Sequence, residues 1–127
     1  MIFVDTSVWI DAYRGGVRAA PLADLLDRRA VALASIVRLE ILGGASKATL
    51  PQLRRTLSAL PTFAPSADTW TLLDRWIERT VAAGEQFGAA DLVIAALASE
   101  RGGQIWSLDA DFARLAKLRL VRLWKPR

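Results

Sequence analysis

The sequence predicts an α/β protein in which helices cover both faces of a parallel sheet. Short apolar segments alternate with longer segments of helical spacing, as in parallel sheets that are buried on both sides. Glycine pairs follow several helical segments, where they end helices. No repeat or linker interrupts the pattern, so we expect one domain over residues 1–127.

Five strands are expected, all short and apolar. They lie at residues 1–4, 31–34, 62–64, 104–108 and 120–123. The segment at 31–34 begins with a β-branched residue, and the segment at 62–64 is bounded by Pro61 and Pro65. Because helices separate these strands, their carboxyl ends should meet at one edge of the sheet, where ligands bind in such folds.

Seven helices are expected between and after the strands. They run from Thr6 or Ser7 to Gly15-Gly16, over 18–29, from Ser35 to Gly43-Gly44, and over 50–60, 67–83, 91–99 and 110–117. Thr6 or Ser7 and Ser35 stand where an N-cap is favoured. Pro51 falls in a first helical turn, where its missing N–H does no harm.

Composition removes several kinds of chemistry. The chain has no cysteine and no histidine, which excludes disulfides, thiolate zinc sites and imidazole as a base or ligand. No apolar run approaches the ~20 residues that span a bilayer, so we expect a soluble, cytoplasmic protein without a membrane partner. Any acid–base chemistry must therefore rest on carboxylates, lysine or the single tyrosine.

Four acidic residues stand beside apolar segments: Asp5, Glu40, Asp91 and Asp109. Taken singly, the three aspartates have a structural explanation, because aspartate is favoured at helix starts. Glu40 lies among apolar residues in the middle of an expected helix, so we expect it to be buried. A buried carboxylate needs a cation, either a basic side chain such as Arg38 or a metal ion.

Together the four acids predict a metal pocket. Mg²⁺ and Mn²⁺ prefer oxygen ligands, and a cluster of carboxylates provides them without histidine or cysteine. Such an ion activates water and polarises a phosphoryl group, which favours a metal-dependent nuclease. Asp111, two residues after Asp109, either joins this shell or faces solvent in the first turn of its helix.

The ordered motifs resemble those of PIN-domain proteins. The segment at 2–7 (IFVDTS) resembles the opening motif, Glu40 in 35–40 (SIVRLE) the second acid, 88–96 (GAADLVIAA) the third motif and 107–112 (SLDADF) the fourth. The resemblance covers nearly the whole chain, in the expected order. Length and simplicity are most similar to VapC-type toxins of type II toxin–antitoxin pairs.

The resemblance implies a three-layer α/β/α sandwich with a mostly parallel central sheet, and a Mg²⁺- or Mn²⁺-dependent endoribonuclease. It assigns Asp5, Glu40, Asp91 and Asp109 to catalysis and metal binding, with Asp111 as a fifth ligand and Ser7 supporting the shell by hydrogen bonding. It also implies an RNA substrate, a homodimer and a cognate antitoxin that covers the pocket, within a larger toxin–antitoxin assembly.

Two other functions remain open from the residues alone. A receiver-type phosphoacceptor would also place an aspartate after its first strand, but would leave Glu40 and Asp91 without a role. A non-catalytic nucleic-acid-binding regulatory module would use the basic C-terminal segment and keep the acids as helix caps. That segment has six basic and no acidic residues after Asp111, which suits a polyanionic ligand or simply a solvated surface.

Overall fold

A parallel sheet of four strands lies at the centre of the fold in the computed structural model, which describes residues 1–127. The strands are β1 (Ile2–Val4), β2 (Val31–Ala34), β3 (Thr62–Phe63) and β4 (Gln104–Trp106), in the order β3-β2-β1-β4. Ile2 aligns with Val31 on one side and with Gln104 on the other. Every residue of β1 and β2 is buried, as expected for strands covered on both faces.

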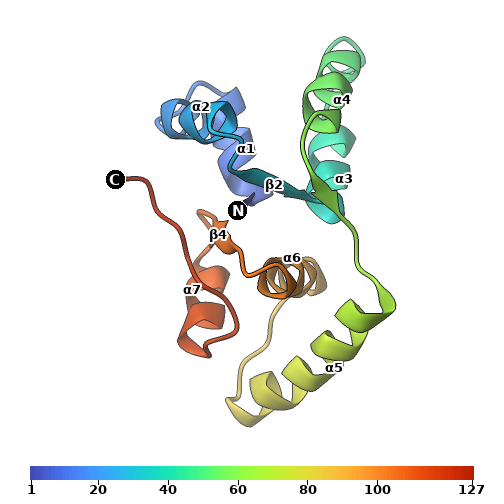
Figure 1. Cartoon of the computed structure of the whole chain (residues 1–127), viewed down its shortest axis with the longest axis vertical. Coiled ribbons are helices and arrows are strands. Elements are labelled where there is room, and N and C mark those ends of the chain that lie inside the picture. The colour runs from blue at the N-terminus through green and yellow to red at the C-terminus, as the bar shows by residue number, and fades with distance from the viewer.

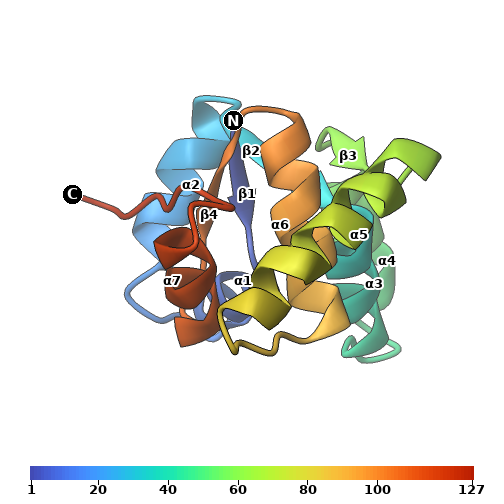
Figure 2. The same ribbon diagram turned by 90° about the horizontal axis from the view of Figure 1, so that it is seen from below.

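Seven helices cover the two faces of this sheet. They are α1 (Thr6–Tyr13), α2 (Ala19–Asp27), α3 (Ser35–Gly43), α4 (Leu50–Ser58), α5 (Ala67–Ala82), α6 (Ala89–Glu100) and α7 (Ala110–Lys117). Figures 1 and 2 show α1 to α4 on one side of the sheet and α5 to α7 on the other. The predicted three-layer α/β/α sandwich with a parallel sheet is thus confirmed. No helix is long and apolar enough to cross a membrane.

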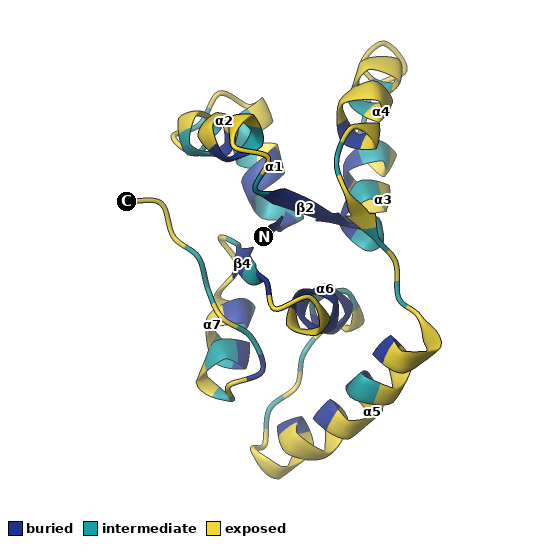
Figure 3. Cartoon of the chain, in the orientation of Figure 1, coloured by how far each residue is buried: buried dark blue, intermediate teal, exposed yellow.

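Helix α6 forms the centre of its layer. All residues from Leu92 to Ala98 are buried, and Figure 3 shows this helix dark blue through its middle, whereas α5 is buried along one side only. Alanines at 95, 96 and 98 let α6 approach β1, β4 and the neighbouring helices closely. This tight packing fixes the first turn of α6, which carries Asp91.

The strand expected at 120–123 is not formed. The chain meets the edge of the sheet at a single bridge between Ile105 and Leu123. The amide of Trp124 then donates to the carbonyl of Ile105 at 2.8 Å, and its ring packs against Trp106 with centroids 4.8 Å apart. Arg119 turns the chain after α7 with a φ of 60°, and at the parallel bridge the amide of Ile105 also donates to the carbonyl of Arg122 at 2.9 Å.

Several helix starts differ from the prediction by one or two residues. Asp5, not Thr6 or Ser7, occupies the N-cap position of α1, and α3 has Ala34 in that position, so Ser35 is already helical. Helix α6 begins at Ala89, before Asp91. For α1 and α3 a strand-to-helix turn without a linking loop explains the shift, because the last strand residue or the next one becomes the N-cap. Helix α6 follows an irregular segment after α5 and has Gly88 as its N-cap.

Candidate acidic site at the strand ends

Asp5 lies at the carboxyl end of the central strand β1 and is 7% exposed. Its Oδ2 atom accepts hydrogen bonds from the hydroxyls of Ser7 at 2.8 Å and Ser107 at 2.7 Å. It makes no side-chain cap to the backbone of α1, so capping does not explain this aspartate. Two donors on one oxygen fix the direction of the carboxylate.

The two serine hydroxyls are themselves held by the backbone after β4. The amide of Leu108 donates to Ser7 Oγ at 3.1 Å, and the amide of Asp109 donates to Ser107 Oγ at 2.9 Å. Because each hydroxyl accepts an amide proton, its own single proton goes to Asp5. The arrangement ties the end of β1 to the end of β4 through side chains.

The sequence interpretation assigned no role to Ser107. The expected strand at 104–108 included Ser107, whereas β4 ends at Trp106, so Ser107 directly follows its strand in the same way that Asp5 follows β1. Since β4 pairs with β1 in parallel, their carboxyl ends are adjacent. A polar residue in that position is therefore expected to face the same site.

Three aspartates form the acidic triad of this site: Asp91, Asp109 and Asp111. One carboxylate oxygen from each lies within 4.8 Å of the others. Asp91 comes from the first turn of α6, while Asp109 is the N-cap of α7 and accepts the amide of Asp111 at 2.9 Å. Asp109 therefore caps a helix and also contributes to the triad.

The pKa of Asp91 shows how the acids are arranged around it. Burial is the main cause that raises this pKa from 3.8 to about 6. The negative charges of Asp109, Asp5, Asp111 and Glu40 raise it further, in that order. The other four predicted acids therefore all lie close enough to act electrostatically on Asp91, and the site concentrates negative charge.

Glu40 is exposed, contrary to the expectation that it is buried. Helix α3 buries Val37 and Ile41, whereas Leu39 and Glu40 lie on its outer side, Leu39 being 70% exposed. The Glu40 carboxylate accepts a hydrogen bond from the Thr6 hydroxyl at 3.2 Å, and Arg38 is not its partner. Apolar neighbours in the sequence were misleading because α3 is covered only on its inner side.

Arg114 connects the two helices that carry the acidic triad. Its Nη1 donates to Asp111 at 2.7 Å, while Nε and Nη2 bind Glu85 and Nη2 also donates to the carbonyl of Gln86 at 2.9 Å. The guanidinium lies 4.4 Å above the ring of Phe87. These bonds, first to Glu85 and then to Asp111, raise the pKa of Arg114, and they join α7 to the segment that leads into α6.

Comparison with known proteins gives the family. The sequence model of the PIN domain matches residues 2–118. "VapC ribonuclease Mb1587" of Mycobacterium bovis and "Ribonuclease VapC11" of Mycobacterium tuberculosis are each 32% identical over 132 residues, with 93% of both chains covered. The structure of VapBC2 from Rickettsia felis bound to a promoter DNA fragment has a similar fold, with a TM-score of 0.74, 19% identity and 98% of each chain covered. This chain belongs to the PIN domain family.

Proposed function

We propose that the protein is an endoribonuclease that requires Mg²⁺ or Mn²⁺ and acts as the toxin of a toxin–antitoxin pair. The observation that carries the proposal is the acidic triad, in which one carboxylate oxygen each from Asp91, Asp109 and Asp111 lies within 4.8 Å of the others. The names of the relatives, which are VapC ribonucleases, support RNA as the substrate.

The residues present fit a hard divalent cation. The acidic triad offers only oxygen atoms, and Mg²⁺ and Mn²⁺ prefer carboxylate and water oxygens. Arg114 contacts Asp111 alone among the five acids, so most of the negative charge has no basic partner. A bound cation would remove the repulsion that raises the pKa of Asp91.

We assign the metal-binding role to Asp5, Glu40, Asp91 and Asp109. Asp5 would help to hold the ion, and the two serine hydroxyls on its Oδ2 atom orient its carboxylate. Asp111 has a lesser part, since one of its oxygens pairs with Arg114. A bound divalent ion supplies Lewis acidity toward a phosphoryl oxygen and lowers the pKa of water.

The chain's own residues orient these acids. Ser7 and Ser107 fix the direction of the Asp5 carboxylate, and the helix-capping bond holds Asp109 in place. Glu40 lies exposed at the border of the site, where RNA arrives. Hydrolysis adds water across a phosphodiester P–O bond, so no covalent intermediate with the protein is required.

The partners of the toxin role are part of the same proposal. The VapBC2 structure contains a toxin–antitoxin complex bound to DNA, which supports an antitoxin partner for this chain. In the basic C-terminal segment, Lys117, Arg119 and Lys125 are exposed and provide positive charge for RNA in the cytoplasm. We also propose that the toxin forms a homodimer.

Asp5→Asn tests the proposal. Asparagine keeps the shape of the side chain but removes its charge, so RNA cleavage with Mg²⁺ or Mn²⁺ should fall to background while the circular dichroism spectrum is kept. Asp74→Asn, at an exposed position on α5, should cleave like the wild type. The two variants should also differ in their effect on cell growth. When expressed without an antitoxin, Asp74→Asn should arrest growth and Asp5→Asn should not.

Two results would overturn the proposal. One is undiminished cleavage by Asp5→Asn. The other is a wild-type protein that binds RNA but cleaves it with neither ion, and this would favour the non-catalytic binding module instead.

A further inference from the structure

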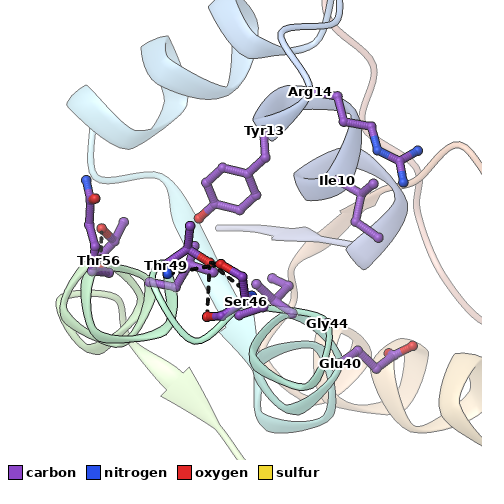
Figure 4. Close-up of a pocket in the computed structure, with 12 residues that line it drawn as sticks. Ile10, Tyr13, Arg14, Glu40, Gly44, Ser46, Thr49 and Thr56 are labelled. Atoms are coloured by element: carbon purple, nitrogen blue, oxygen red, sulfur yellow. Dashed lines mark hydrogen bonds between the residues drawn. The ribbon is translucent and has the colours of Figure 1, made fainter.

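A pocket of about 570 Å³ lies between α1, α3 and α4, next to the acidic site (Figure 4). Glu40 belongs to both, because it lines the pocket and its carboxylate accepts a hydrogen bond from Thr6, the residue after Asp5. In Figure 4 Glu40 lies at the edge of the pocket, and its carboxylate points away from Tyr13, Ser46 and Thr49. A molecule in the pocket therefore lies beside whatever the acidic site cleaves.

Tyr13 presents an aromatic face inside this pocket. Its side chain is 49% exposed, and one face packs on Trp9 with ring centroids 6.1 Å apart and planes 29° apart. Trp9 is 2% exposed, so it holds the tyrosine ring on a rigid base. Figure 4 shows the ring crossing the pocket with its hydroxyl toward Thr49. The free part of the ring is a surface on which a flat group can stack.

The opposite wall is polar. Thr56 donates to the Gln52 carbonyl at 3.1 Å, and the hydroxyls of Ser46 and Thr49 bond to each other at 2.9 Å, which fixes three hydroxyls along this wall. The side-chain amide of Gln52 is exposed and free to offer a donor and an acceptor together. A glutamine amide matches the edge of a nucleobase, where donors and acceptors also stand side by side.

We propose that this pocket binds one base of the RNA substrate, stacked on Tyr13 and read at its edge by Gln52. The inference rests on the proposed ribonuclease function and adds to it a determinant of the cleavage sequence. Arg14, exposed at the end of α1 and outside any ion pair, contacts the phosphate that joins this base to the cleavage point.

A side chain from a protein partner is the other possible occupant, because Ile10, Ile41 and Leu53 make part of the lining apolar. The base is favoured for two reasons. The Gln52 amide and the half-exposed Tyr13 ring offer edge hydrogen bonding and stacking together, and an apolar side chain would use only the ring. The pocket also shares Glu40 with the acidic site, which an RNA substrate must approach to be cleaved.

The test is cleavage of an RNA pool with randomised sequence, followed by sequencing of the cut ends. The wild type should prefer particular bases at one fixed position near the cut. Tyr13→Ala and Gln52→Ala should lose the preference at that position, and Tyr13→Ala should raise KM about 5- to 100-fold, the range expected for one lost stacking contact. Tyr13→Phe should keep the wild-type KM, because the ring remains.

Trp70→Ala is the matched control, since Trp70 is 57% exposed on α5, on the other side of the sheet. It should leave the cut sites and KM unchanged. Cleavage by Tyr13→Ala with the wild-type pattern and KM would overturn the inference, assign the pocket to a protein partner and leave the ribonuclease function standing. Absence of cleavage by the wild type would overturn the proposed function and this inference with it.

Discussion

Ser107 donates a 2.7 Å hydrogen bond to Oδ2 of Asp5, a residue 102 positions earlier in the chain. The parallel pairing of β1 with β4 makes the contact possible, because it places the residues that follow both strands next to each other. Ser7 donates to the same oxygen, so two hydroxyls share the orientation of one carboxylate.

Ser107→Ala should weaken metal binding without unfolding the protein. Asp5 would keep only one of its two donors, and loss of such a supporting partner typically costs about 10- to 100-fold in metal affinity or activity. The measurement is the cleavage rate as a function of Mg²⁺ concentration, which should need more metal for half its maximum. Ser99→Ala, at an exposed position on α6, is the control. A Ser107→Ala curve that overlays the wild type would show that Ser7 alone suffices.

The stability of the metal-free protein should fall as the pH rises from about 4 to about 6. Asp91 has a pKa of about 6 in the folded chain against 3.8 ordinarily, so over this range the folded state binds more protons than the unfolded state. Raising the pH therefore favours unfolding, and the loss is complete above pH 6. The test is Tm against pH in the presence of a chelator. A Tm that rises steadily from pH 4 to pH 7 would contradict the raised pKa.

Asp91→Asn extends this test to the metal. Removing the charge should raise the Tm of the chelated protein at pH 7.5 by about 3 °C, equivalent to on the order of 1 kcal/mol after solvent screening is allowed for. Mg²⁺ should stabilise the wild type and have little effect on the variant. Equal stabilisation of both proteins by Mg²⁺ would place the ion elsewhere.

Arg114→Ala should separate α7 from the segment before α6 and so loosen the acidic triad. The side chain binds Glu85, Asp111 and the Gln86 carbonyl and covers Phe87. We expect about a 10-fold lower cleavage rate and a higher metal requirement. Arg114→Lys should recover only part of this, because lysine lacks the forked geometry. The control is Arg75→Ala, at an exposed position on α5, which should change neither the cleavage rate nor the metal requirement. If Arg114→Ala also changed neither, Arg114 would have no role in the site.

The sequence predicts the parts of the site that depend on strand ends and motif order. Asp5 and Asp109 follow apolar strands, and such residues meet at one edge of a parallel sheet. Whether Glu40 is buried or exposed could not be predicted from the sequence. The same apolar stretch fits a helix buried on every side and a helix such as α3 that is buried only on its inner face.

Details of the chain's turns were also beyond the sequence. The direction of the chain after Arg119 affects whether residues 120–123 form a strand. A positive φ at an arginine has no signature in the sequence. The role of Arg114 depends on Glu85, 29 positions away, in a segment with no regular structure. Only the folded arrangement shows that pair.

The position of β1 between β2 and β4 has a consequence for folding. Pairing β1 with β4 closes a loop from residues 2–4 to residues 104–106, and contacts so distant in the chain are slow to form because of the entropy lost on closure. Asp5 meets Ser107 only when that loop closes. We therefore expect refolding kinetics in which cleavage activity returns in the slowest phase, after most helical structure has formed, so that partly folded chains leave RNA intact.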